Sequence, residues 1–257
     1  MNKRGTSPEV SVIMPTFNSE KYIANAISSV INQKFKNWEL LIIDAESTDK
    51  TNKIVENFVK SDPRVRLVIN FDDRGPAHAR ATGIRLAAGQ FVAFLDADDL
   101  WFPSKLEKQL DFMKKNSFRF SYTLYSHISE SGKDIRTAYS YPWYDYQKSL
   151  RTRGIGCLTV MVDRNLFTED IIRLNEKKHG EDYLWWLSIM KKGVRAYGLM
   201  EVHAKYRKIE GSLSSQRLSH LKSIWSIYRS ELGLSFLHTC FCFLNLIYFK
   251  FIIDKQV

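Results

Sequence analysis

Short apolar runs alternate with longer amphipathic stretches over about the first hundred positions of the chain. Each run is rich in β-branched residues and short, which predicts a buried strand. The stretches between them have the apolar spacing of helices, and Asn18 is placed to cap the first helix. The expected strands are residues 10–14, 38–44, 65–70 and 90–95, with helices at about 20–32, 50–60 and a third that ends near Gly89.

Strands that are apolar throughout are typical of a parallel sheet covered on both faces. Right-handed crossovers then give an α/β fold with a Rossmann-like, open and mostly parallel sheet. Ligands of such sheets bind beyond the carboxyl ends of the strands. Asp44 ends one predicted strand and Asp96 directly follows another, so both are candidates for chemistry at that edge.

The rest of the chain has a less regular pattern. We expect a main domain over residues 1–215, with halves of about 8–100 and 101–215, and a helical C-terminal segment over 216–257. Within residues 101–215 the pattern predicts strands at 120–128, 157–162 and about 195–199, and a helix at 182–192. It also predicts helix from Leu218 to the end.

The 257-residue chain has a formal net charge of +10 and only three cysteines, without CxxC spacing. The cysteines argue against a disulfide framework or zinc site and favour a reducing cytoplasm, and no apolar signal region is visible near the start. The positive charge fits a solvated basic surface, an anionic membrane, a phosphate-bearing substrate or nucleic acid. Nucleic acid is the weakest of these, because no nucleic-acid-binding motif is present.

Three carboxylates crowd the segment Asp96-Ala-Asp-Asp99, directly after a predicted buried strand. They repel one another unless a cation or hydrogen-bond donors neutralise them, and a hard divalent cation prefers such oxygen ligands. That cation would also bridge the phosphates of a nucleotide sugar and act as a Lewis acid. The alternative is an acidic turn in which Asp99 and Ser104 cap the next helix.

Asp44 and Arg80 are further candidates near this edge. The Asp44 carboxylate can accept a hydrogen bond from a nucleobase imide or a ribose hydroxyl, or it can be a helix N-terminal acid favoured by the macrodipole. The Arg80 guanidinium can pair with a diphosphate or with Asp96, or it can be an ordinary surface arginine.

Asp182 begins a predicted helix that carries Trp185 and Trp186. Its carboxylate suits a general base acting on an acceptor hydroxyl, with the tryptophans stacked on a sugar ring. The alternative is a helix-capping aspartate with both tryptophans in the core.

These pieces occur in an order that resembles the family 2 glycosyltransferases of bacterial surface-polysaccharide synthesis, which have the GT-A fold. The likeness covers roughly residues 8–215. The segments that carry it are Ser11-Val-Ile-Met-Pro-Thr-Phe-Asn18, Ile42-Ile-Asp-Ala-Glu-Ser-Thr-Asp49, Gly75 with Ala79-Arg-Ala-Thr-Gly83 and Ala88-Gly89, Phe94-Leu-Asp-Ala-Asp-Asp99, Gly180-Glu-Asp182, and Tyr206-Arg207 with Gly211-Ser-Leu-Ser214.

The resemblance implies an inverting, metal-dependent glycosyltransferase with a nucleotide-sugar half and an acceptor half. The expected donor is a UDP-sugar. The resemblance also implies that Thr16 and Asp44 bind the nucleoside, that Arg80 supports the donor, and that Asp96 contacts ribose or assists the metal. It further implies that Asp98 ligates Mn²⁺ or Mg²⁺ and that Asp182 is the catalytic base. The acceptor would be a glycan or a polyprenyl-diphosphate-linked glycan in cell-surface polysaccharide biosynthesis, such as that of O-antigen and lipopolysaccharide.

The segment Asp44-Ala-Glu-Ser47 departs from the Asp-Asp-Gly-Ser or Asp-Gly-Gly-Ser of many relatives. Ala45 removes a carboxylate that often reads uracil, so the resemblance does not fix the nucleobase. Glu46 stands where a glycine is common.

Residues 232–253 are mostly apolar, but His238, Asn245 and Lys250 interrupt them. From His203 onward eight Lys and Arg residues stand against three acidic residues. We expect an interfacial helix that holds a cytoplasmic enzyme peripherally at the inner face of the cytoplasmic membrane. The alternative is a helix packed on the domain or on a second subunit.

Two other functions share some of these features. A nucleotidyltransferase also places carboxylates and a metal on a Rossmann-like sheet, but it needs a glycine-rich basic loop where this chain has Pro15-Thr-Phe-Asn18. A catalytically inactive nucleotide-sugar-binding module would not need Asp96, Asp98 and Asp182 together.

Overall fold

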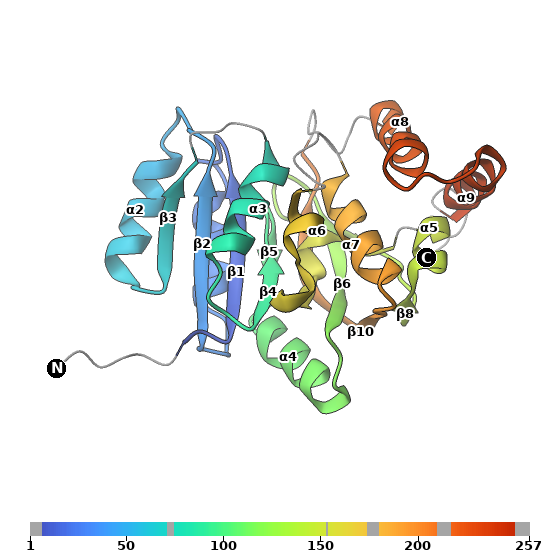
Figure 1. Ribbon diagram of the computed structural model, residues 1–257. Coiled ribbons are helices and arrows are strands. Elements are labelled where there is room, and N and C mark those ends of the chain that lie inside the picture. The colour runs from blue at the N-terminus through green and yellow to red at the C-terminus, as the bar shows by residue number, and fades with distance from the viewer. Residues whose placement is uncertain (1–6, 71–74, 153, 174–179, 210–216, 250–257) are drawn as a thin grey trace.

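A computed structural model describes residues 7–70, 75–152, 154–173, 180–209 and 217–249. Within these ranges a single sheet has ten strands, and its main path runs in the order β3-β2-β1-β4-β9-β6-β10-β5, with β7 added beside β6 and β8 beside β10 (Figure 1). The strands are β1 Val10–Thr16, β2 Trp38–Asp44, β3 Val65–Ile69, β4 Phe91–Phe94, β5 Leu100–Trp101, β6 Phe120–Ile128, β7 Asp134–Thr137, β8 Trp143–Tyr144, β9 Met161–Asp163 and β10 Ala196–Arg207.

Helices cover both faces of the sheet and create two hydrophobic cores. One core joins the sheet to α1, α2 and α4, and the other joins it to α3, α6 and α7. The helices are α1 Ile23–Ile31, α2 Thr51–Ser61, α3 Pro76–Leu86, α4 Lys105–Asn116, α5 Tyr146–Thr152, α6 Glu169–Arg173, α7 Glu181–Lys191, α8 Arg217–Ser226 and α9 Phe236–Tyr248.

The first four strands are parallel, which confirms the predicted Rossmann-like half. β1 and β2 are buried along their whole length because helices lie on both sides of them. Gly83 explains how closely α3 approaches this sheet, since a Cβ built there would lie 2.4 Å from Cγ2 of Ile13. A side chain at this position of the Arg80-Ala-Thr-Gly83 segment would therefore push α3 away from β1.

The second half of the sheet is mixed. β9 is antiparallel to β4 on one side and to β6 on the other, and β6 is parallel to β10. The predicted strand at 157–162 is wrong over its first half, because residues 157–159 form a 3₁₀ turn in which the Thr159 hydroxyl donates to Gly156 O at 2.6 Å. β10 is much longer than the predicted strand at 195–199, since it continues beside β6 up to Arg207.

The predicted helix at 182–192 is present as α7, and its two tryptophans belong to the core. Trp185 and Trp186 are at most 1% exposed, and both rings pack on Phe94 of β4. The Trp185 indole N–H also donates to Ile171 O at 3.0 Å. Of the two interpretations left open, stacking on a sugar ring is therefore wrong and burial is confirmed.

The prediction of continuous helix from Leu218 onward is wrong, because residues 232–235 are not helical. α8 passes into a π-helical turn over residues 227–231, and Gly233, with a φ of 63°, separates it from α9. α9 then packs on α5 (Figure 1). Among the described residues, no helix combines the length and the apolar character needed to cross a bilayer.

Candidate functional site

The carboxyl ends of β1 and β2 bring two predicted binding residues side by side. Thr16 and Asp44 are directly paired in the register of these parallel strands. Thr16 is 5% exposed, and its hydroxyl has no hydrogen-bond partner among the described residues. A buried hydroxyl without a partner costs free energy unless a ligand or water completes it, so this edge favours a polar ligand.

Phe17 follows Thr16 and is 54% exposed. Large aromatic side chains are usually buried, so an exposed ring beside an unpartnered hydroxyl is suited to stacking on a planar base. The apolar run that predicts β1 gives no sign of this exposure, because it depends on where the chain leaves the sheet.

Asn18 does not cap the first helix, contrary to the sequence prediction. α1 begins only at Ile23, and Asn18, which has a positive φ of 45°, links two loops instead. Its side-chain oxygen accepts from Thr48 N at 2.8 Å, and its backbone N–H donates to the Ser47 hydroxyl at 2.8 Å. These bonds hold the β1–α1 and β2–α2 loops together at the carboxyl edge.

Asp44 is fully buried at this edge, and its carboxylate already has protein partners. One oxygen accepts from Ser47 N at 2.8 Å and from the Asn52 side chain at 3.1 Å, and the other accepts from the Ser47 hydroxyl at 2.5 Å. These contacts give Asp44 a role in shaping the β2–α2 loop. Direct contact between Asp44 and a nucleoside stays a prediction.

Glu46 lies in the same loop with a φ of 57°, in the left-handed region. Glycine adopts this conformation without the steric cost that a Cβ brings. The backbone therefore explains why a glycine is suited to this position. Glu46 itself is exposed.

The Asp96–Asp99 turn follows β4, and two of its three carboxylates have distinct partners. Arg80 of α3 is 6% exposed, and its Nη2 pairs with Oδ1 of Asp96 at 2.5 Å. The surface-arginine alternative is therefore wrong for Arg80. Asp99 is buried and accepts from Arg207 N at 2.8 Å, while Ser104 makes no side-chain capping bond to α4. The interpretation of this turn as a cap for the next helix is thus also wrong.

Asp98 stands between these two acids and is partly exposed. Among the described residues no side chain donates a hydrogen bond to it. Burial, together with the nearby Asp96 carboxylate, raises the pKa of Asp98 to about 6. Its ionised form is therefore destabilised in the absence of a further positive charge.

These residues fit a divalent cation that is only partly coordinated by protein. Among the described residues no three His, Cys, Asp or Glu side chains converge as a complete metal-binding set. Mg²⁺ in phosphate chemistry commonly uses one or two carboxylates and takes its other ligands from phosphate oxygens and water. Asp98, with Asp96 beside it, provides that donor set.

Asp182 reaches the same edge from α7. α7 ends shortly before β10, and β10 starts at the amino edge of the sheet. The helix is about 16 Å long, so its first turn lies at the carboxyl edge (Figure 1). The N-cap position is Gly180, with a φ of 88°, so Asp182 lies in the first turn of the helix and not at the cap position itself. Asp182 Oδ1 accepts from Tyr183 N at 2.7 Å, and the side chain is half-buried.

Arg207 is a residue of this edge to which the sequence pattern assigned no role. It ends β10 and donates from Nε to Asp98 O at 2.9 Å. Its place in the Tyr206-Arg207 segment was a sequence signal, but the contact joins residues 109 positions apart. Pattern analysis does not reveal such a contact.

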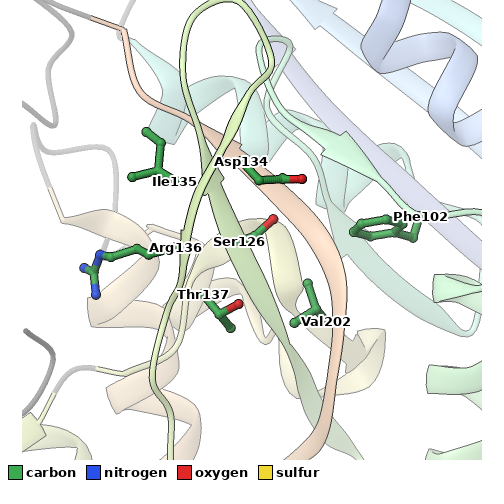
Figure 2. Close-up of a pocket in the computed structure, with 7 residues that line it drawn as sticks. All are labelled: Phe102, Ser126, Asp134, Ile135, Arg136, Thr137 and Val202. Atoms are coloured by element: carbon green, nitrogen blue, oxygen red, sulfur yellow. The ribbon is translucent and has the colours of Figure 1, made fainter. Parts of the chain in front are cut away.

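A hollow of about 360 Å³ lies elsewhere on the second half of the sheet, between β7 and β10. Figure 2 shows Asp134, Ser126 and Thr137 on one side of it and Phe102 on the other, with Val202 between them. The Lys205 ammonium pairs with Asp134 at 3.0 Å and lies 5.3 Å from the Phe102 ring. None of the six predicted site residues lines this hollow.

Comparison with known proteins shows which family the chain is similar to. Residues 11–168 match the model of glycosyl transferase family 2. The chain is 38% identical over 251 residues to the putative teichuronic acid biosynthesis glycosyltransferase TuaG of Bacillus subtilis, covering 97% of this chain and 98% of that protein. It is 40% identical over 222 residues to the UDP-Glc:alpha-D-GlcNAc-diphosphoundecaprenol beta-1,3-glucosyltransferase WfgD of Escherichia coli, covering 85% and 84%.

The fold is similar to that of residues 1–349 of S. aureus TarS, solved with UDP-GlcNAc. The TM-score is 0.74 at 21% identity, with 96% of this chain and 74% of that chain covered. This likeness in fold confirms the GT-A architecture expected from the sequence. The match to the family model and the two full-length relatives lead to one conclusion: this chain is a glycosyltransferase and belongs to family 2.

Proposed function

We propose that the protein is a metal-dependent, inverting glycosyltransferase that uses a nucleotide sugar, with a UDP-sugar as the expected donor. The observation that carries the proposal is the carboxyl edge of the sheet, where Asp98 and the Arg80–Asp96 pair lie and towards which α7 begins. The name of WfgD and the solved complex of TarS both include a UDP-sugar, which supports this donor class.

The donor would lie across the carboxyl ends of β1, β2 and β4. The unpartnered Thr16 hydroxyl and the Asp44 loop are suited to the nucleoside, and Asp96, held by Arg80, to the ribose or metal. A Mn²⁺ or Mg²⁺ ion held by Asp98 would supply Lewis-acid neutralisation of the departing diphosphate.

Asp182 would remove the proton from an acceptor hydroxyl as that oxygen attacks the anomeric carbon. The bond between that carbon and the diphosphate oxygen breaks as the new glycosidic bond forms on the opposite face. A single displacement inverts the configuration, so an α-linked donor gives a β-linked product. The proton ends on Asp182.

Hydrolysis of nucleotide sugars without an acceptor tests this function. We expect slow release of UDP from one UDP-sugar in a donor panel when Mn²⁺ or Mg²⁺ is present, and none in EDTA. Chromatography of the released nucleotide is the measurement. Release of pyrophosphate from a nucleoside triphosphate and a sugar phosphate would instead indicate a nucleotidyltransferase. A protein that binds UDP-sugars but turns over none, with or without acceptor, would be a binding module.

The acceptor is proposed to be a glycan, in particular a lipid-linked one used in surface-polysaccharide assembly. WfgD acts, by its name, on a diphosphoundecaprenol-linked sugar, and TuaG is named for teichuronic acid biosynthesis. Such an acceptor lies at a membrane surface, so the enzyme must work beside the bilayer.

The C-terminal residues 216–257 supply a surface for that contact in this proposal, and residues 1–215 form the catalytic part. α9 has an inner face in the core, with Cys242 and Leu246 buried. Its outer face carries an exposed apolar stripe. The stripe consists of Leu237, Phe241, Leu244 and Tyr248, which are between 53% and 80% exposed and spaced as one helical face. Contiguous exposed apolar side chains mark interaction surfaces.

We propose that this stripe dips into the headgroup region at the cytoplasmic face of the membrane. Lys222 and Arg229 are exposed on the neighbouring α8 and π-helical turn, where they can meet anionic lipid. The contact is peripheral, so the stripe does not need the length of a membrane span.

Replacing Leu237, Phe241 and Leu244 together by Gln is expected to weaken binding to phosphatidylglycerol vesicles at least about tenfold. The melting temperature should stay near that of the wild type, since these side chains are already in water. Co-sedimentation with vesicles measures the binding. The matched control is Ile135→Gln with Met200→Gln, two exposed apolar residues outside α9. A wild-type dimer that the triple variant converts to a monomer would identify the stripe as a subunit interface instead.

A further inference from the structure

Arg207 contacts the acidic turn, Asp96–Asp99, at two points. This arginine is 6% exposed at the end of β10. Its backbone N–H donates to Oδ1 of Asp99 at 2.8 Å, and its Nε donates to the carbonyl oxygen of Asp98 at 2.9 Å. One residue therefore binds the backbone carbonyl oxygen of Asp98 and the side-chain carboxylate of Asp99.

The same guanidinium also binds two other loops at this edge. Its Nη1 donates to Glu130 O at 2.8 Å, in the turn between β6 and β7. Its Cζ lies 5.0 Å from the centre of the Tyr22 ring, and the Tyr22 hydroxyl donates to the Glu130 carboxylate at 2.7 Å. The acidic turn, the β6–β7 turn and the start of the first helical segment thus meet on one side chain.

Arg80 and Arg207 bind the acidic turn through different kinds of acceptor atom. Arg80 binds Asp96 through its carboxylate, whereas Arg207 binds Asp98 through its carbonyl oxygen. The Asp98 carboxylate therefore remains available to a cation while the backbone beneath it is held. A planar guanidinium with five donors can bind carbonyl oxygens of several loops at once, and a lysine cannot reproduce that geometry.

We infer that Arg207 is a positioning residue that fixes the Asp98 carboxylate for the metal–diphosphate part of the donor and couples this turn to the β6–β7 turn. The inference rests on the proposed function. Arg207 itself contacts neither the donor nor the acceptor in this role. It acts through the backbone of the Asp96–Asp99 turn, as residues behind metal ligands often do.

The experiment compares UDP binding with and without Mn²⁺ by titration calorimetry for the wild type, Arg207→Gln and Arg207→Lys. We expect both variants to bind UDP in Mn²⁺ about 10–100-fold more weakly, the usual effect of losing a group behind a metal ligand. Binding of UDP in EDTA should change less than about twofold. The Lys variant keeps the charge, so its failure would show that the geometry of the guanidinium is what matters.

Arg64→Gln is the matched control. Arg64 also stacks on an aromatic ring, that of Trp38 at 3.8 Å, but it precedes β3 at the opposite edge of the sheet. Its UDP binding should equal that of the wild type. If Arg207→Gln does not fold, Arg207→Lys takes its place. A second measurement is then whether guanidinium chloride restores the UDP affinity of Arg207→Ala, with NaCl of equal ionic strength as the control.

Two results would overturn the inference. One is wild-type affinity for UDP in Mn²⁺ in a folded Arg207 variant, and the other is an equal loss of UDP affinity with and without metal. Failure of the proposed function looks different, because the wild type itself would then show no gain in UDP affinity from Mn²⁺.

Discussion

Asp182→Asn is expected to lower sugar transfer at least about a hundredfold while the protein remains folded and still binds its donor. A general base typically contributes 10²–10⁴-fold to the rate. Asn has nearly the same shape, and its amide oxygen can keep the bond from Tyr183 N that Asp182 accepts at 2.7 Å. The change therefore removes the proton acceptor with little effect on α7. Turnover at saturating acceptor, the melting temperature and UDP affinity are the three measurements.

Asp145→Asn is the matched control for this substitution. Asp145 accepts from Lys148 N at 2.8 Å at the start of α5, so it is an aspartate with a purely local helical role. It should keep wild-type turnover. If Asp182→Asn retains more than about a tenth of the wild-type rate, Asp182 is not the base. Glu181, the adjacent carboxylate in the sequence, would then be the next residue to test.

The parts of the fold that local pattern determines could be predicted closely. β2 and β6 begin and end at the predicted residues, and Asp44 and Asp96 lie at the strand ends where the sequence placed them. A buried parallel strand is apolar along most of its length, so the local sequence shows where it begins and ends. The sheet edge, and with it most of the candidate site, follows from those limits.

Other features depend on contacts between distant segments, which local pattern does not contain. The extension of β10 to Arg207 requires β6 beside it, and the loop pairing by Asn18 requires Ser47 and Thr48 from the next unit. Trp185 and Trp186 could be read as sugar platforms or as core until Phe94 was seen to pack on both. In each case the sequence left a choice that tertiary packing decides.

Asp98→Asn is the second large effect that we expect, again with transfer lowered at least about a hundredfold. A metal that neutralises a departing diphosphate contributes several kcal/mol, and each 1.36 kcal/mol corresponds to about tenfold in rate. The substitution removes a negative charge that burial and Asp96 already destabilise, so the fold should tolerate it. Asp111→Ala, at an exposed position on α4, is the control and should be silent.

UDP affinity distinguishes a metal ligand from a purely structural role of the turn, because the two roles predict changes in different directions. Without metal, the Asp98 carboxylate repels the diphosphate, so Asp98→Asn should bind UDP in EDTA as well as the wild type or better. In Mn²⁺ the order should reverse, because the wild type gains affinity from the cation and the variant does not. Loss of UDP affinity in both conditions would mean that the substitution damages the turn itself. Full wild-type transfer in EDTA would show that the acidic turn acts without a metal, and Asp98 would then have no role as its ligand.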